Sequence, residues 1–595
     1  MTHGHEPIDF RGTERFTLVA LLGRGGSGAV YEARDRERGG HVALKVLGER
    51  SAWAISHFKN EFRSLQELKH PNLVELKELI FEGGHWLLSM ELVRGTDILS
   101  HVWRKTGAPR VAPPRPPLIA SSDDDTLRDG DARPIRREGE PAPESFCETR
   151  VRRAFTELAR GLGALHAAGK IHRDVKRSNV LVDADERVVV LDFGLVAELG
   201  ADGAVALSER AGTAVTMAPE QASAGKVGPA ADWYAFGAVL YEALAGRAPF
   251  AGSRQEILEQ KRCSRPPRAD WLARAPSDLR ELCLALLAHD AALRPTGPEV
   301  LARLAGARPS EVWSGASSTS AQPAFVGRER ELAVLDAALE RAQAGGSVTI
   351  VVEGESGLGK TSLAREFLSR VRRRERAPLV FSGRCFERES LPYKAMDGVV
   401  DTVREYLRAL PPGAAGAVLP RDLAEIARIF PVLHELVPPL ALEAPARAVD
   451  PHAQRQRAFR AMRELFVRLA ADRGCVVVMD DVHWADVDSV AMLATVLAPP
   501  TPRVLWLCLR RPSSPGALAA LPGSVTTVAL GPLTADESSA LMANLLGARA
   551  RDLDRHVLVE SVREGSGHPL FLRELARELT HSGAAAPPAG LGAAL

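Results

Sequence analysis

IHRDVKRSNV at residues 171–180 is followed twelve residues later by DFG at residues 192–194. These two motifs determine how the other parts of the chain are interpreted. They place two carboxylates, an amine and an amide on neighbouring loops, in the side chains of Asp174, Asp192, Lys176 and Asn179. Phosphoryl transfer from Mg-ATP to a hydroxyl needs such a set: an acid to orient the hydroxyl, a cation for the moving phosphate, and an amide with a second acid for Mg²⁺. A chance turn rich in aspartate does not account for two spaced motifs that are flanked by the apolar segments 180–182 and 188–191.

Length and composition limit the other classes of function. The chain has 595 residues, enough for about three to four domains of roughly 150 residues. Its net charge of +1 gives no reason to expect binding to nucleic acid or to a membrane surface. The six scattered cysteines indicate reduced thiols rather than a disulfide framework or a zinc site. Without a signal-like N-terminus or an apolar run of roughly 18 residues, we predict a cytoplasmic protein with no membrane span.

The two motifs together resemble the H-R-D-x-K-x-x-N and D-F-G signatures of protein kinases. Lys176, two residues after Asp174, is typical of serine/threonine kinases rather than tyrosine kinases. The resemblance implies a bilobal α+β kinase domain over residues 16–305, after a short N-terminal extension, residues 1–15. It also implies that Asp174 and Lys176 are catalytic, and that Asn179 and Asp192 hold Mg²⁺.

A glycine-rich segment near the N-terminus fits this resemblance. Gly23, Gly25 and Gly28 follow a strand-like run, and glycines let backbone N–H groups approach phosphates closely. The pattern G-x-G-x-x-G alone is weak, and a dinucleotide-binding fold would continue it with a helix. Here the chain continues as a second strand, turns, and reaches the V-A-L-K sequence that ends at Lys45. We therefore predict a β-hairpin in which Lys45 binds the α and β phosphates.

A glutamate on the next helix should hold this lysine in an active kinase. The helix is predicted at about 54–68, with Ile55, Phe58, Phe62 and Leu65 on its inward face at steps of three and four. Glu61 shares that face. Glu67 is the alternative, near the end of the helix.

The resemblance also implies an adenine pocket. Met90 would lie at its back, and the backbone of residues 91–93 would bond adenine. The side chains that the pattern assigns to the ATP site are those of Leu22, Val30, Ala43, Met90, Glu91, Val93 and Leu181. The apolar residues among these are also core residues, and lining an adenine pocket is compatible with belonging to the core.

Residues 105–147 interrupt the kinase pattern. The segment is rich in proline and charge, and lacks aromatic residues between Trp103 and Phe146. It cannot bury enough apolar surface to offset the entropy of ordering it, so we predict a disordered insertion. A docking site for a partner is the alternative, because proline-rich segments can be ligands.

The activation segment runs from Asp192 to the closing sequence M-A-P-E at residues 217–220. Kinases usually show G-T-P-x-Y before this closing sequence, whereas residues 212–216 read GTAVT, without the proline and the tyrosine. The resemblance assigns structural roles to four residues: Glu220 pairs with Arg294, Asp232 binds the backbone of the catalytic loop, and Thr213 contacts Asp174 and Lys176. Two further residues are assigned to activation. Arg173 would bind an activating phosphate, and Ser208 would carry that phosphate. Ser208 is the only hydroxyl between Leu195 and Gly212.

A second nucleotide site follows in the other half of the chain. An apolar run at 348–352 leads directly into GESGLGKT at residues 354–361, a complete G-x-x-x-x-G-K-[ST] loop between a strand and a helix. The loop glycines are Gly354, Gly357 and Gly359; Lys360 should reach the β and γ phosphates and Thr361 should coordinate Mg²⁺. After a second apolar strand, Asp480 is the expected magnesium acid and Asp481 the residue that positions water. Arg510, at the end of a third strand, is a candidate sensor of the γ-phosphate.

Residues 325–580 resemble the P-loop ATPases of signal-transducing regulators, an α/β fold with a parallel sheet and a helical C-terminal part. In that family the proline of a G-x-P motif, here Pro569, lies near adenine. Such modules often follow a serine/threonine kinase and precede helical repeats, but no internal repeat is found here. Residues 306–324 are the expected linker and 581–595 a flexible tail.

The whole pattern predicts an intracellular serine/threonine kinase joined to an ATP-binding switch, with ATP and Mg²⁺ as cofactors and ATP at two sites. Its implied partners are protein substrates with serine or threonine, a regulatory partner, and further copies of the chain through the ATPase module. Two other classes of function remain. One is a kinase-like regulator that binds ATP without transfer, which the complete set of catalytic residues disfavours. The other is an ATP-driven scaffold, which the absence of repeats disfavours.

Overall fold

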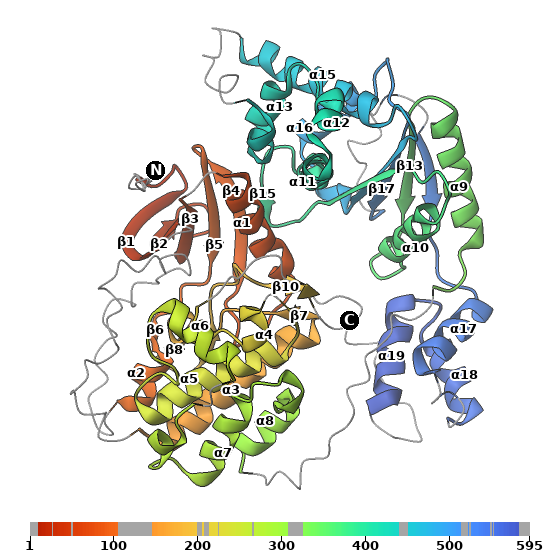
Figure 1. Ribbon diagram of the computed structural model, residues 1–595. Helices are drawn as coiled ribbons and strands as arrows, with labels where there is room; N and C mark the ends of the chain where they lie inside the picture. Colours follow the sequence, from red (N-terminus) through yellow and green to blue (C-terminus); the bar gives the residue numbers. More distant parts are fainter. Residues whose placement is uncertain are drawn as a thin grey trace. The chain divides into compact units, whose positions relative to one another are not determined.

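The computed structural model describes residues 10–25, 28–48, 51–104, 146–198, 205–206, 213–223, 225–264, 267–306, 325–438, 450–512, 522, 525–547, 550 and 553–581. Its contacts divide the chain into two compact units, residues 1–319 and 320–595, which are described separately (Figure 1).

An antiparallel sheet and one helix form the first lobe of the N-terminal unit (Figure 1). The strands lie in the order β1 (Phe16–Gly25), β2 (Gly28–Asp35), β3 (His41–Leu47), β5 (His85–Met90) and β4 (Leu76–Glu82). Because successive side chains of a strand point to opposite faces, Tyr31 and Leu44 enter a closed apolar core. Their neighbours Val30 and Ala43 lie in a second cluster with Leu22. The second face is therefore available to a ligand.

Helix α1 (Ala52–Leu65) begins at Ser51, whose hydroxyl accepts a hydrogen bond from the backbone N of Ala54 at 3.2 Å. It ends three residues before the predicted boundary. Its buried face carries Ile55, Phe58, Phe62 and Leu65 as predicted, and Glu61 lies on the same face.

The second lobe is mainly helical. It is built around α5 (Ala230–Ala245), which is apolar nearly all round and buried from Ala231 to Leu244. The other elements of this lobe are α2 (Ile98–Trp103), α3 (Glu148–Ala167), α4 (Pro219–Ala222), α6 (Arg254–Arg262), α7 (Ser277–Leu286), α8 (Gly297–Leu304) and the short helices η1 (Arg177–Asn179), η2 (Ala269–Leu272) and η3 (Ala291–Leu293). Small strand pairs or ribbons are formed by β6 (Gly95–Asp97) with β8 (Val180–Asp183) and β9 (Val188–Val190), by β7 (Lys170–Ile171) with β10 (Ala197–Glu198), and by β11 (Val205–Ala206) with β12 (Lys226–Val227).

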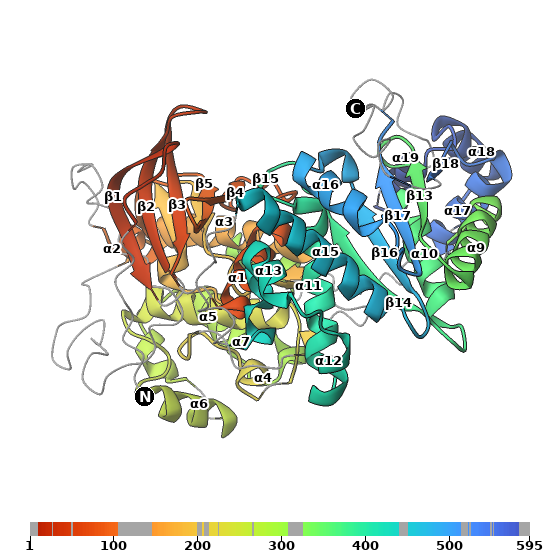
Figure 2. The same cartoon turned by 90° about the horizontal axis from the view of Figure 1, so that it is seen from above.

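The C-terminal unit contains a parallel five-stranded sheet. Its order is β14 (Leu379–Arg384), β16 (Cys475–Asp480), β17 (Val504–Arg510), β13 (Val348–Glu353) and β18 (Val525–Ala529). Helices α9 (Glu329–Ala344) and α10 (Lys360–Arg372) cover one face, where Ile350 and Leu507 are buried (Figure 2). Trp506, one residue away from Leu507, points to the other face and packs on Phe466 of α15 (Pro451–Leu469). Both faces are covered, as expected for parallel strands that are apolar throughout.

Further helices complete this unit. They are α11 (Lys394–Ala409), α12 (Pro412–Val418), α13 (Leu423–Ile429), η5 (Pro431–Leu436), η6 (Val482–Trp484), α16 (Val487–Val496), α17 (Ala535–Leu546), α18 (Arg555–Glu564) and α19 (Pro569–His581); β15 (Glu389–Ser390) is a short strand. The last three helices share their own apolar core, which includes Leu533, Met542 and Leu572. The predicted fold class, a bilobal α+β domain followed by an α/β domain with a helical C-terminal part, is confirmed.

Several predicted segments lie mainly outside the described residues. These are residues 105–145 of the predicted insertion, residues 307–324 of the linker, residues 582–595 of the tail, and Ser208. Of the insertion, Phe146 and Cys147 are described, and Cys147 immediately precedes α3. The domain boundaries and the cytoplasmic location stay predictions. Within the described ranges, none of the helices combines the length and the apolar character needed to cross a bilayer.

Candidate functional site

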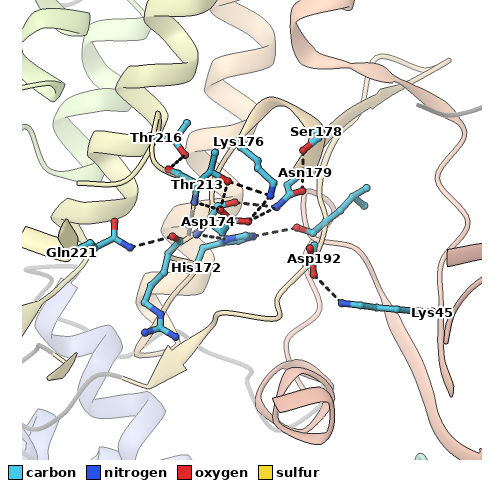
Figure 3. Close-up of polar contacts among 12 residues, drawn as sticks. Lys45, His172, Asp174, Lys176, Ser178, Asn179, Asp192, Thr213, Thr216 and Gln221 are labelled. Carbon is cyan, nitrogen blue, oxygen red and sulfur yellow. Dashed lines mark hydrogen bonds and ion pairs between the residues drawn. The ribbon is translucent and has the colours of Figure 1, made fainter. Parts of the chain in front are cut away.

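Asp174 lies at the centre of a network of polar contacts on the catalytic loop (Figure 3). Its Oδ1 accepts hydrogen bonds from the backbone N and from Oγ1 of Thr213, at 3.1 and 3.0 Å. Its Oδ2 forms an ion pair with Nζ of Lys176 at 2.9 Å, and this amine also donates to Oγ1 of Thr213 at 3.3 Å. The structure therefore brings together the acid, the lysine and the threonine that the sequence assigned to one site.

Asp232, on the buried helix α5, binds the backbone of this catalytic loop. The carboxylate of Asp232 accepts hydrogen bonds from the backbone N atoms of His172 and Arg173, both at 2.8 Å. His166, at the end of α3, lies 2.8 Å from the same carboxylate. Burial acts to raise the pKa of Asp232, but His166 and the backbone donor outweigh it and lower the pKa. An ionised Asp232 thus fixes the position of the loop that presents Asp174.

Lys45 is buried between two carboxylates. Its Nζ donates to both oxygens of Glu61 at 2.9 and 2.8 Å, and to Oδ1 of Asp192 at 3.0 Å. Burial acts to lower the pKa of Lys45, but Asp192 and Glu61 outweigh it and raise the pKa above its ordinary value. Burial likewise acts to raise the pKa of Asp192, but Lys45 brings it down to about 2. The structure selects Glu61 over Glu67 and joins β3, α1 and the DFG segment through one lysine.

Asn179 lies next to the DFG segment through the backbone, where the N of Leu191 donates to the carbonyl of Asn179 at 2.8 Å. The side-chain amide of Asn179 donates to the backbone carbonyl of Asp174 at 3.0 Å, which leaves its oxygen directed elsewhere. That oxygen accepts from Ser178 at 3.3 Å. This amide oxygen and the carboxylate of Asp192 are hard oxygen donors of the kind that Mg²⁺ prefers, so the two side chains could hold the ion.

A cleft opens between the two lobes next to Lys45. The predicted adenine residues Leu22, Val30, Ala43, Met90, Glu91, Val93 and Leu181 all line it, together with Gly23, Gly28, Lys45, Glu61 and Asp192. The cleft also contains residues that were not assigned to the ATP site from the sequence: Val74, Leu76, Leu92, Leu191 and Phe193. Leu92 and Phe193 lie in the segment 91–93 and in the DFG motif, which the sequence had already indicated, whereas the other three lie in segments whose apolar character indicated only core. The cleft is apolar where a base would lie and charged where phosphates would lie.

The activation segment is described at both of its ends. Near the start, Nε of Arg173 donates to the carbonyl of Leu195, and burial lowers the pKa of Arg173. At the end, the guanidinium of Arg294 binds both oxygens of Glu220, at 2.7 and 2.9 Å. Ser208 falls outside the described residues, so its role as the regulatory phosphorylation site stays a prediction.

The second nucleotide site is assembled at one edge of the parallel sheet. The loop after β13 and the acid at the end of β16 meet there, because parallel strands end at the same edge. Oγ1 of Thr361 donates to Oδ2 of Asp480 at 2.7 Å, so the two predicted magnesium ligands lie together. Nζ of Lys360 donates to the carbonyls of Gly354 and Glu355, at 2.8 and 2.9 Å. Burial raises the pKa of Asp480 and lowers that of Lys360.

Two other residues assigned to this site have partners that the sequence did not predict. Oδ2 of Asp481 accepts from Nε of Arg384, at the end of β14, at 2.9 Å. Arg510 donates from Nε and Nη2 to Oε2 of Glu353, at 2.9 and 2.7 Å. Arg510 is therefore bound to the strand that precedes the phosphate loop, and its predicted role as a γ-phosphate sensor would require this pair to open.

The G-x-P segment contacts the phosphate loop directly. Nε2 of His568 lies 2.9 Å from the carbonyl oxygen of Ser356, and Pro569 begins α19. Gly357 has a φ of +82°, and a Cβ there would lie 2.4 Å from Cε1 of His568. Pro569 is thus placed beside the phosphate loop, although the base itself is not placed.

His483 was not assigned from the sequence. Its side chain is 8% exposed, its Nδ1 lies 4.0 Å from Asp481, and neither ring nitrogen has a hydrogen-bond partner among the described residues. The only indication in the sequence that His483 lies near this site was its position three residues after Asp480. The contact of Arg384 with Asp481 had no such signal, because Arg384 ends β14 and Asp481 directly follows the neighbouring strand β16, far away in the sequence.

Comparison with known proteins identifies two domains in the chain. Residues 16–304 match the family of protein tyrosine and serine/threonine kinases, and residues 324–507 match the AAA ATPase domain. The chain thus contains a protein kinase domain followed by an AAA ATPase domain.

Its relatives include bacterial serine/threonine kinases. PknA of Mycobacterium tuberculosis is 31% identical over 308 residues, 50% of this chain and 62% of that protein. RqkA of Deinococcus radiodurans, a DNA damage-responsive serine/threonine kinase, is 32% identical over 317 residues, 50% of this chain and 40% of that protein. Pkn2 of Myxococcus xanthus is 31% identical over 301 residues, 48% of this chain and 32% of that protein. The chain spans less than two thirds of each of these three relatives.

Proposed function

We propose that this protein is a serine/threonine protein kinase that uses Mg-ATP, coupled to an ATP-binding regulatory module. The observation that carries the proposal is the ion pair of Lys45 with Glu61, which a kinase needs for transfer, formed next to the DFG carboxylate of Asp192. The serine/threonine preference is supported by Lys176 and by the bacterial relatives.

Each residue then has a defined role in the proposed reaction. Asp174 accepts the proton of a serine or threonine hydroxyl, and Lys176 stabilises the charge on the phosphate that is transferred. Lys45 binds the α and β phosphates, and Asn179 and Asp192 hold Mg²⁺, which neutralises charge on the phosphates. The apolar cleft from Leu22 to Leu181 binds adenine.

A regulator that binds ATP without transferring phosphate is the rival interpretation. Such a protein needs the cleft but not Asp174, Lys176 and Thr213 in mutual contact. Their contacts at 2.9–3.3 Å favour an enzyme.

Transfer of labelled γ-phosphate from ATP to a set of serine and threonine peptides tests this function. We expect transfer by the full chain, and a loss of several orders of magnitude in Asp174→Ala and Asp192→Asn, because positioning and electrostatic stabilisation carry most of this catalysis. Binding of ATP to Asp174→Ala should persist. Normal transfer by either variant, or none by the wild type, contradicts the proposal.

For the second site we propose slow ATP hydrolysis and a long-lived bound nucleotide, as in a switch. Asp481 is shorter than the glutamate that fast ATPases of related type place there, and its carboxylate is already paired with Arg384 at 2.9 Å. A short carboxylate that is already paired with an arginine is a poor base for activating water. We expect Lys360→Ala to abolish nucleotide binding at this site. Rapid steady-state hydrolysis that is lost in Lys360→Ala but kept in Lys45→Met would contradict the switch.

A further inference from the structure

A buried lysine on α6 is bound to the end of the activation segment. Lys261 is 1% exposed, and its Nζ donates to the carbonyl oxygens of Ala214, Val215 and Met217, at 2.7, 2.8 and 2.5 Å. An ammonium group has three protons to donate and no acceptor. All three are therefore used by a single loop, residues 214–217.

This lysine belongs to a larger cluster that holds the segment at two points. The ring of Tyr234, on α5, faces the ammonium of Lys261 at 5.0 Å and the guanidinium of Arg294 at 4.9 Å. Arg294 binds Glu220. Lys261 thus holds residues 214–217 and Arg294 holds Glu220, so the last part of the activation segment is bound at two points beside one aromatic ring. Burial lowers the pKa of Lys261 well below its ordinary value. The three carbonyls each need a donor, and their bonds to the ammonium group offset part of its lost hydration.

The loop that Lys261 holds adjoins the catalytic acid. Thr213 binds Asp174 through both its backbone N and its hydroxyl, and residue 214 follows directly. A hydroxyl that reaches Asp174 therefore approaches beside residues 214–217. In this same loop the chain has alanine at 214 and threonine at 216, where kinases usually have the proline and the tyrosine of G-T-P-x-Y.

We propose that Lys261 is a positioning residue for the protein substrate, which orders loop 214–217 as the surface on which the substrate lies and takes over the role of the missing proline and tyrosine. Lys261 does not touch the substrate; it acts through the three carbonyls that it binds. The proposal rests on the protein kinase function proposed above. Within that function, it assigns the affinity for the protein substrate to loop 214–217.

The test compares Lys261→Met with the wild type in the full chain, using a serine peptide that the wild type selects on a peptide array. We expect the KM for the peptide to rise about tenfold or more, which corresponds to about 1.4 kcal/mol. The KM for ATP, and the hydrolysis of ATP by the kinase site in the absence of peptide, should stay within about twofold of the wild type, because Lys45 and Asp192 are untouched. An unchanged KM for the peptide overturns the proposal, and so does a parallel loss of ATP affinity and hydrolysis.

Two further variants keep the test decisive. Arg262→Met removes the neighbouring cation of the same helix, which is half-exposed, and should leave the KM for the peptide unchanged. If Lys261→Met does not fold, Lys261→Gln decides: its amide has two N–H donors and cannot bind all three carbonyls, so the KM for the peptide should still rise, and a wild-type KM in that variant overturns the proposal. Absence of peptide phosphorylation in the wild type would instead reject the kinase function itself.

Discussion

Lys45 shows how one side chain links three parts of the kinase domain. It leaves the ligand face of β3, binds Glu61 on α1 and binds Asp192 at the start of the activation segment. Removing one member of such a buried set leaves an uncompensated charge, which is more costly than the absence of the whole set. The contact is therefore a sensitive point for both activity and stability.

The choice between Glu61 and Glu67 gives a matched pair of variants. We expect Glu61→Gln to lower kcat/KM for peptide phosphorylation by about 100-fold or more, because a neutral amide no longer holds Lys45 toward the phosphates. Glu67→Gln, in the turn that directly follows α1 and outside this contact, should remain within about twofold of the wild type. Peptide phosphorylation at saturating peptide and varied ATP measures both. Equal losses in the two variants would contradict the assignment of Glu61.

Glu242 makes a second prediction at the residue scale, about stability and pH. It is buried on α5, and its Oε1 has no hydrogen-bond partner among the described residues; Arg177 lies 3.7 Å away. Burial raises the pKa of Glu242 to about 7, although Arg177 acts to lower it. The folded state then binds the proton more tightly than the unfolded state, so stability falls as the pH rises from about 4.5 to about 7.

We therefore expect Glu242→Gln to stabilise the kinase domain at pH 8 relative to the wild type, by roughly 2–3 kcal/mol, and to have little effect near pH 4.5. Thermal unfolding of the two proteins across this pH range measures the difference. Glu281→Gln, which changes an exposed residue of α7, is the control and should leave the pH dependence as in the wild type. A difference that grows toward low pH would contradict the sign of the prediction.

At the scale of elements, the parts with strong local patterns were predictable. The hairpin that ends at Lys45, the apolar face of α1 and the strand–loop–helix around Lys360 were all found from sequence. The strands β14 and β18 were not, because each is an edge strand in which few side chains are buried and polar residues interrupt the apolar pattern. Contacts between distant elements, such as that of Lys261 with loop 214–217, leave no local signal in the sequence.

The contact between the phosphate loop and the start of α19 yields the prediction for this scale. Gly357 and Gly359 both have a positive φ, of +82° and +93°, so alanine strains the backbone at either site by about 1–2 kcal/mol. A Cβ at Gly357 would in addition lie 2.4 Å from His568 and 2.9 Å from Cβ of Leu570, whereas nothing in the described chain lies within 4 Å of one at Gly359.

Gly357→Ala should therefore release α19 from the loop, and Gly359→Ala should not. Hydrogen exchange of the protein without nucleotide measures this: we expect faster exchange at the start of α19 in Gly357→Ala alone. Both variants should bind nucleotide more weakly, since both change the loop that holds phosphate. Equal exchange rates at α19 in the two variants would show that the contact does not order the helix.

At the scale of the whole molecule, the chain combines two units, each with its own core and its own nucleotide site. A ligand that binds only the folded state raises the unfolding free energy by RT ln(1 + [L]/Kd), about 2.7 kcal/mol at a concentration 100 times Kd. If each unit unfolds cooperatively, the chain has two thermal transitions. ATP with Mg²⁺ should therefore raise the midpoint temperature of each transition by an amount that depends on the affinity of the nucleotide site in that unit.

We expect Lys45→Met to reduce the ATP-dependent rise of the kinase transition alone, and Lys360→Ala to abolish the rise of the ATPase transition alone. Scanning calorimetry of the full chain and both variants, with and without Mg-ATP, separates the two effects, and the double variant should show neither. A change in the kinase transition caused by Lys360→Ala would mean that the occupancy of one site alters the free energy of the other unit. By linkage, the affinity of the kinase site for ATP would then depend on nucleotide at the second site, as a regulatory switch requires, and peptide phosphorylation at subsaturating ATP measures this dependence. If the two shifts are strictly independent, the two nucleotide sites belong to two independent enzymes that share one chain, and the proposed coupling is contradicted.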